Sequence, residues 1–229
     1  KLNTNFRKNN FKFCRYALEP LDLSVVGSDE VLSLQSGANI MMYGHCVNAK
    51  ALMAYAPCIG LTTLEDVKKW HCEALISSGL KMFSALSARD ERTAEIMTEL
   101  TGVQNIPIVC DPVLLYDFSK IKVPYKKIKE KYLIAYTYDR YFVDEKEINA
   151  IKSYAKSKGL KVASVGTYHK WCDYNIACDP LEWIEYFRDA QEVITTTFHG
   201  TILSIITDTP MAVISKQPKV LSVLENLGL

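Results

Sequence analysis

The sequence predicts an α/β fold built from two Rossmann-like domains with parallel sheets. Short apolar runs alternate with longer stretches of helical periodicity along almost the whole chain. This alternation is typical of parallel strands joined by crossover helices. The 229 residues, of which 48% are hydrophobic and 23% charged, are enough for two small cores. A lysine-rich, proline-containing stretch over 121–131 is expected to be an interdomain linker or a solvated basic loop. A patch that binds a membrane surface or an acidic polymer is the alternative.

The first expected domain is an α/β domain over residues 1–120. Its strands are expected where apolar runs end near Gly, Ser or Pro: 22–28, 51–60, 81–88 and 106–112. Thr63, followed by two acids, should start a helix that continues to about Ser77, because its side chain can accept a free backbone amide. A second helix is expected over 90–102, since acids stand in its first turn and Gly102 can end it.

The second expected domain is a Rossmann-like domain over residues 132–229. Its strands are expected at four apolar runs: 132–139, 161–168, 192–198 and 211–215. Helices are expected in the periodic stretches between and after them: 144–159, 179–190, 199–209 and 220–228. Asp179 followed by Pro180 is the best local start signal, because Asp caps free amides and Pro suits the first helical turn.

The composition of the chain excludes several classes of protein. The net charge of +1 argues against a nucleic-acid partner, which usually requires a strongly basic domain. No apolar run reaches the roughly 18 residues needed to span a membrane. The cysteines are odd in number (seven) and lack a C-x-x-C pair, which indicates a reducing compartment and no structural zinc. Together with the absence of a signal-peptide pattern, this predicts a cytoplasmic protein without a metal site.

The sharpest candidate site is the strand-to-helix junction TTTFHGT at residues 195–201. Its hydroxyls, with the first free amides of the helix, can hold an anion, and Gly200 would let a ligand approach the backbone. His199 would lie beside that anion and exchange a proton near neutrality. The competing interpretation is a histidine that only caps or packs at the turn.

Two further junctions carry polar groups. In SALSARDERT (84–93), a strand delivers Ser87 and Arg89 to a helix start, and Arg binds carboxylate or phosphate as a bidentate fork. Alternatively, Arg89 is simply paired with its acidic neighbours. In VVGSDE (25–30), Ser28 and Asp29 follow a strand and either form a turn or bind a hydroxyl. Elsewhere, Trp171 and its neighbouring tyrosines either stack on a sugar or pack in the core.

In order along the chain, these pieces resemble the polysaccharide pyruvyl transferase family. The resemblance rests on five segments: DLSVVGSDEVL, AYAPCIG, LSARDERTAEIMTELTG, VCDPVLL and DAQEVITTTFHGTILSIITDTPMAVIS. It implies a GT-B-like fold whose two domains face a cleft. It also implies transfer of a pyruvyl group from phosphoenolpyruvate to sugar hydroxyls, which forms a ketal. The partners would be phosphoenolpyruvate, as donor substrate with no cofactor, and a sugar or lipid-linked glycan that brings the enzyme to the inner membrane.

The resemblance also assigns roles to residues. Arg89 would bind the carboxylate or phosphate of the donor, and His199 would contact the donor and supply a proton. Thr197, Gly200 and Thr201 would complete the anion site. Substitution of Arg89 or His199 by Ala is then expected to abolish transfer and to leave the fold intact.

Two departures from the family pattern keep alternatives open. Some members have Arg where this chain has Thr197, so a donor-binding cation is either lost or supplied elsewhere, for example by Lys216. The family's first strand and Gly-rich turn are also missing before 22–28, so the N-terminal domain is expected to be incomplete. A glycosyltransferase that uses a nucleotide sugar and a catalytically silent sugar-binding paralogue are the alternatives.

Overall fold

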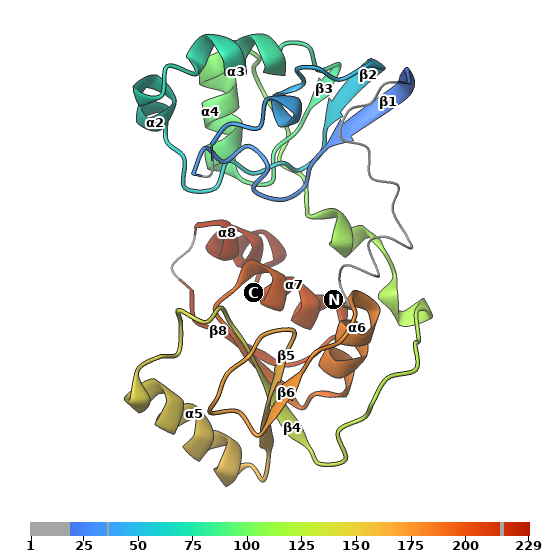
Figure 1. Ribbon diagram of the computed structural model, residues 1–229, viewed down its shortest axis with the longest axis vertical. Helices are drawn as coiled ribbons and strands as arrows, with labels where there is room; N and C mark the ends of the chain where they lie inside the picture. Colours follow the sequence, from blue (N-terminus) through green and yellow to red (C-terminus); the bar gives the residue numbers. More distant parts are fainter. Residues whose placement is uncertain (1–18, 36, 216–217) are drawn as a thin grey trace. The chain divides into compact units, whose positions relative to one another are not determined.

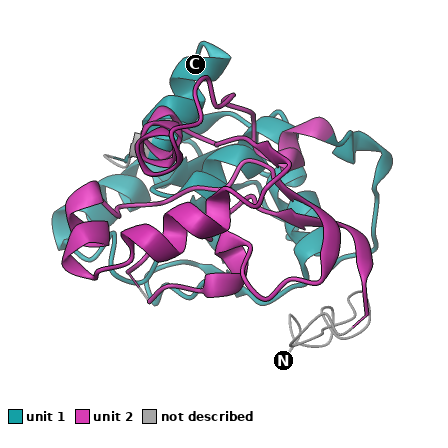
Figure 2. Cartoon of the chain, turned by 90° about the horizontal axis from the view of Figure 1, so that it is seen from above, with its two compact units in different colours: residues 1–12, 116–229 teal, residues 13–115 magenta. Residues whose placement is uncertain are grey.

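The structure, a computed structural model, describes residues 19–35, 37–215 and 218–229. These residues form two compact units, 19–115 and Tyr116–Leu229 (Figure 2). Each unit has its own parallel sheet and its own apolar core, so the predicted α/β class with parallel sheets is confirmed. None of the described helices is long and apolar enough to cross a membrane.

The unit of residues 19–115 is built on a three-stranded parallel sheet in the order β1-β2-β3. The strands are β1 (Leu21–Val26), β2 (Ala49–Ala54) and β3 (Ala85–Leu86), and Val26 pairs with Ala54. Its helical segments are η1 (Ile40–Tyr43), α2 (Leu64–Lys69), α3 (Glu73–Leu80), α4 (Glu91–Thr101) and η2 (Pro112–Leu115). Apolar side chains of α3 and α4 pack with those of β1 and β2 in one core.

The helix expected from Thr63 to Ser77 is interrupted. Thr63 starts α2 with a reciprocal capping box to Asp66, as its position predicts. The helix then ends because His71 takes a left-handed φ of 52°, while Cys72 N–H donates to Val67 O at 3.0 Å. These are the features of a Schellman motif, in which Gly usually takes the left-handed position. Because His71 takes that position here, the sequence contains no Gly that would predict the end of the helix.

The strands expected over 81–88 and 106–112 are also much shorter than predicted. Only Ala85–Leu86 forms β3, and the second run contributes a single parallel bridge, between Ala88 and Ile108. Pro107 lies beside that bridge and has no N–H to donate, which limits the ladder. The segment 106–112 therefore contacts the edge of the sheet but does not form a strand.

The unit Tyr116–Leu229 contains a five-stranded parallel sheet in the order β6-β5-β4-β7-β8. Its strands are β4 (Tyr132–Tyr136), β5 (Lys161–Val165), β6 (Tyr174–Ile176), β7 (Glu192–Thr195) and β8 (Met211–Val213). Its helical segments are η3 (Phe118–Lys120), α5 (Glu145–Ser157), α6 (Pro180–Asp189), α7 (Phe198–Ile206) and α8 (Pro218–Leu227). Strand β6 was not predicted, because three residues are too few to show a periodicity.

Helices cover both faces of this sheet. Alternate residues of β4 point to opposite faces, so Leu133 and Ala135 pack with α5, whereas Ile134 and Tyr136 pack with α6. Figure 1 shows α5 on one side of the strands and α6 with α7 on the other. The carboxyl ends of all five strands consequently lie at one edge, where parallel sheets bind ligands.

The lysine-rich stretch 121–131 has neither helix nor strand and lies against α6. Val123 N–H donates to the Glu185 carboxylate at 3.0 Å, and the Tyr186 hydroxyl donates to the Lys126 carbonyl at 2.7 Å. The rings of Tyr125 and Tyr186 meet edge to face, with centroids 4.9 Å apart. The stretch is thus attached to the second unit at several points instead of being fully solvated.

Candidate functional site

Arg89 follows β3 and is held by two carboxylates that are distant in sequence. Its Nη1 lies 3.2 Å from Asp111 Oδ2, and its Nη2 lies 3.8 Å from Asp29 Oδ1. Arg89 and Asp111 are each only 7% exposed, so this ion pair is buried. Ser28 joins the same group by donating its hydroxyl to Asp111 Oδ2 at 3.3 Å. The structure therefore brings Ser28, Asp29 and Arg89 together, with Asp111 at their centre.

The acidic neighbours of Arg89 in sequence have other functions. Asp90 is the N-cap of α4 and accepts from Thr93 N–H at 2.8 Å. It also accepts from the Cys58 thiol at 3.0 Å. Burial and the adjacent Asp90 carboxylate raise the pKa of Cys58 to about 11, so this thiol stays protonated near neutrality. Among the described residues the ion pairs of Arg89 go to Asp111 and Asp29 and not to its sequence neighbours, since Asp90 is the N-cap of α4 and Glu91 stands in its first turn.

The hydroxyl of Ser87 is used inside the unit. It donates to the Ala54 carbonyl at 2.8 Å and accepts from Ala56 N–H at 3.1 Å. These bonds join the end of β2 to the residue after β3. The predicted contact of Ser87 with a substrate has no support in this geometry and stays a prediction.

The second junction is formed by the end of β7 and the start of α7. Thr197 is the N-cap of α7, and its hydroxyl accepts from Gly200 N–H at 2.9 Å. The Thr201 hydroxyl donates to the Thr197 carbonyl at 2.9 Å. Both threonines are almost fully buried, at 1% and 0% exposed. Their hydroxyls cap and brace the helix in this structure, and a direct contact with an anion stays a prediction.

Gly200 allows close packing between α7 and the sheet. A Cβ at this position would lie 2.2 Å from Thr195 Oγ1 and 2.7 Å from the Tyr136 ring. The first turn of α7 therefore approaches β4 and β7 more closely than any other residue would allow. The side of Gly200 that lacks a side chain faces the core, and the approach of a ligand to its backbone stays a prediction.

We expect Gly200→Ala to lower the free energy of unfolding by about 1–3 kcal/mol, the usual cost of overpacking a core. Urea denaturation followed by circular dichroism measures the loss. Thr195→Ala is the matched relief variant, because it removes the nearest clashing atom. The double variant should lose less than the sum of the two single variants, and strict additivity would contradict this account.

His199 is the exposed member of this junction. Its imidazole meets the Phe198 ring edge to face at 5.9 Å and makes no hydrogen bond to any described residue. Because Phe198 is buried, it fixes the start of the helix and leaves His199 facing outward. An exposed imidazole at a helix N-terminus can meet a bound anion and exchange a proton with it.

A cation lies beside the Phe198 ring, but it is not the predicted one. Lys219, in the first turn of α8, places Nζ 5.9 Å from the centre of the Phe198 ring. Lys216, the residue predicted to replace a missing cation, lies outside the described residues. The signal that points to Lys219 is its place directly after Pro218, at a helix start that follows a strand. Its proximity to Phe198 is tertiary and cannot be read from the sequence.

The described residues contain no group of three His, Cys, Asp or Glu side chains arranged to hold a metal ion. The chemical groups at the two junctions are instead a buried guanidinium between carboxylates, an exposed imidazole and an ammonium.

The Thr137 and Thr196 hydroxyls are 2.5 Å apart and join the ends of β4 and β7. The second junction is therefore a rigid edge carrying His199.

Solved structures with a similar fold are enzymes of the GT-B type. One is S. aureus MnaA in a co-structure with UDP, which is 10% identical with a TM-score of 0.57 and covers 89% of this chain and 61% of that chain. Another is the UDP-GlcNAc 2-epimerase of Methanocaldococcus jannaschii in complex with UDP-GlcNAc and UDP, which is 14% identical with a TM-score of 0.51. That match covers 89% of this chain and 63% of the epimerase, so this chain spans less than two thirds of either enzyme.

At these identities the likeness shows the fold alone. A comparison with curated proteins finds no match. The sequence model that describes polysaccharide pyruvyl transferases matches residues 1–218, which is nearly the whole chain. The segments that carry the resemblance, from Ser28 to the His199 junction, lie within that match, and the chain belongs to the polysaccharide pyruvyl transferase family.

Proposed function

We propose that this protein transfers a pyruvyl group from phosphoenolpyruvate to two hydroxyls of a sugar, forming a pyruvate ketal. The observation that carries the proposal is His199, an exposed imidazole at the start of α7 with the Lys219 ammonium beside the same Phe198 ring. Both groups suit an anionic donor that must be protonated during the reaction. The family to which the chain belongs supplies the reaction class.

The steps balance with the groups present. His199 gives a proton to the methylene carbon of phosphoenolpyruvate, which leaves the adjacent carbon electrophilic. A sugar hydroxyl adds to that carbon, and its proton restores the imidazolium. The phosphate leaves with the electrons of its C–O bond, a second hydroxyl of the sugar closes the ketal, and the proton of that hydroxyl passes to the departing phosphate. Lys219 and the amino end of α7 stabilise the negative charge of the donor and of the departing phosphate.

Arg89 has a positioning role in this proposal. Its charge is already balanced by Asp111 and Asp29, so it holds three loops of the first unit together. A direct contact with the donor carboxylate would require the Asp29 contact, at 3.8 Å the longer of the two, to open. The assignment of Arg89 as a donor-binding residue therefore stays a prediction.

The test is a ligand comparison on the full-length protein. Thermal shift with phosphoenolpyruvate, UDP and inorganic phosphate should show stabilisation by phosphoenolpyruvate, because a ligand that binds only the folded state raises the melting temperature. Stabilisation by UDP alone would favour a glycosyltransferase that uses a nucleotide sugar. The absence of any shift with phosphoenolpyruvate would contradict pyruvyl transfer.

A further inference from the structure

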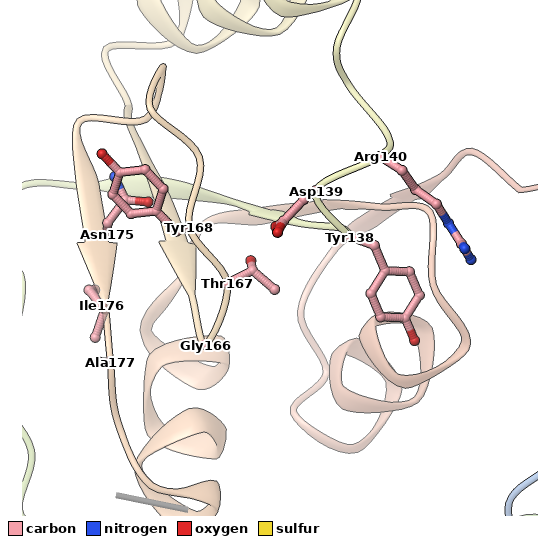
Figure 3. Close-up of a pocket in the computed structure, with 9 residues that line it drawn as sticks. All are labelled: Tyr138, Asp139, Arg140, Gly166, Thr167, Tyr168, Asn175, Ile176 and Ala177. Atoms are coloured by element: carbon pink, nitrogen blue, oxygen red, sulfur yellow. The ribbon is translucent and has the colours of Figure 1, made fainter. Parts of the chain in front are cut away.

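A cavity of about 830 Å³ opens at the carboxyl edge of the sheet in the second unit. Two loops and one strand end line it: the loop after β4 with Tyr138 and Asp139, the loop after β5 with Thr167 and Tyr168, and the end of β6 (Figure 3). Its volume is within the range of small-molecule sites. This is also the edge at which open parallel sheets bind ligands.

The charge in the cavity selects against anions. Figure 3 shows the Asp139 carboxylate between Thr167 and Tyr138, whereas the Arg140 side chain points away. Arg140 stacks on the rings of Tyr138 and Tyr141, at 5.5 and 5.2 Å. Asp139 is exposed and makes no ion pair within the described part of the chain. An unneutralised carboxylate repels phosphate and carboxylate groups but accepts hydrogen bonds from hydroxyls.

Two tyrosine rings form the apolar part of the wall. Tyr168 is 68% exposed and Tyr138 is 45% exposed, so both rings are accessible to a ligand in the cavity. Trp171 is different, because it packs on Phe142 and His169 in the core. Trp171 is therefore not part of the wall, and Tyr168 is the more exposed of the two tyrosines that are.

The loop that carries Tyr168 is held in place from three sides. Asn175 accepts from His169 N–H at 2.7 Å and donates back to the His169 carbonyl at 3.1 Å. The Ser164 hydroxyl lies 2.9 Å from the Thr167 carbonyl. Gly166, at φ 74°, lies so close to Trp183 that a Cβ would fall 2.0 Å from the indole ring. The wall is thus preorganised, which reduces the entropic cost of binding.

We propose that this cavity binds the acceptor: a neutral hexopyranose of the glycan, packed on the Tyr168 ring, with hydroxyls donating to Asp139. A sugar ring provides both apolar C–H faces and vicinal hydroxyls, which match an aromatic wall beside a carboxylate. The loop after β4, which lines the cavity, is joined to the end of β7 before the His199 junction by the Thr137–Thr196 hydrogen bond. Its role as an acceptor site rests on the proposed pyruvyl transfer, but its preference for neutral sugars does not.

The first experiment measures binding without the reaction. Neutral methyl hexopyranosides of gluco, galacto and manno configuration are titrated into the full-length protein by calorimetry and saturation-transfer NMR. At least one should bind, and Tyr168→Ala and Asp139→Asn should each weaken it about tenfold or more. Tyr168→Phe, which keeps the ring, and Asp208→Asn, an exposed acid on the turn after α7, should bind as wild type does. Because these side chains are exposed, the variants should keep the wild-type melting temperature.

The outcomes separate this inference from the proposed function. Binding of none of the three pyranosides, or wild-type affinity in both Tyr168→Ala and Asp139→Asn, overturns the sugar site. UDP that competes with the sugar and depends on Tyr168 would also overturn it in favour of a nucleotide. If sugar binds but no pyruvyl transfer occurs, the cavity stands and the proposed function falls. If transfer occurs, the same two variants should raise the KM for the acceptor about tenfold and leave the KM for phosphoenolpyruvate unchanged.

Discussion

His199→Ala should lower the rate of pyruvyl transfer by about 100- to 10,000-fold, the usual contribution of a positioned general acid. The stability of the protein should change little, because the imidazole is exposed and makes no hydrogen bond to a described residue. His199→Gln tests the same point with better retention of shape, since an amide can bind an anion but cannot give up a proton at neutral pH. Phosphate release from phosphoenolpyruvate in the presence of a glycan acceptor measures the rate.

The control for this prediction is His71→Asn. His71 is exposed at the end of α2 with a left-handed φ, which Asn tolerates, and it lies in the other unit. The His71→Asn variant should leave the rate of pyruvyl transfer unchanged. Turnover close to wild type in His199→Ala or His199→Gln would remove His199 from the mechanism. Thermal shift with phosphoenolpyruvate should still be seen for His199→Gln, which separates a lost proton donor from lost binding.

Arg89→Met should lower the free energy of unfolding of the first unit by about 3–5 kcal/mol, because it leaves the buried Asp111 carboxylate without its cation. This differs from the expectation from sequence that substitution of Arg89 leaves the fold intact. The structural reason is that the ion pair is buried and joins segments 22 residues apart. Urea denaturation and hydrogen exchange of the amides in β1 and β2 measure the effect.

The double variant Arg89→Met/Asp111→Leu separates the effect of the buried ion pair on stability from any contact of Arg89 with the donor. Replacing both members of a buried ion pair with apolar groups removes the unpaired charge, so the double variant should be more stable than Arg89→Met alone. Lys50→Met is the control, because its pair with Asp22 is exposed on both sides and should contribute little. Wild-type stability of Arg89→Met would show that Asp111 does not depend on Arg89. Full transfer activity in the double variant would exclude a direct contact between Arg89 and the donor.

The local signals in the sequence predicted the helix ends well. Thr63 and Asp179 each cap a helix as predicted, and Gly102 ends α4 with a left-handed φ. Asp90 and Asp144, the first residues of two expected helices, are N-caps in the structure. Such signals are reliable because the capping side chain and the amide that it binds lie within three residues of each other. The end of α2 escaped prediction because His71, not Gly, takes the left-handed conformation.

The partners of the site residues depended on contacts between distant segments. Asp111 lies in an expected strand (106–112) and is not a candidate site residue in the sequence analysis, yet it accepts hydrogen bonds from Arg89 and Ser28. Lys219 was missed because its ammonium meets Phe198 only after α8 folds onto α7. The same holds for Tyr168, which lines a cavity with Tyr138 from a loop some 30 residues away. The spacing of residues in the sequence does not predict such tertiary contacts.

By itself, the sequence determined the alternation of strands and helices, the caps and the order of motifs that places the chain in its family. These follow from periodicity and from bonds between near neighbours. Only the tertiary structure decided what each polar group does. Thr197, Thr201 and Gly200 contribute to the capping and packing of α7, Arg89 pairs with a buried acid, and His199 is left exposed. The reason is physical: whether a side chain meets a ligand or the interior depends on burial and on partners that the fold alone brings into reach.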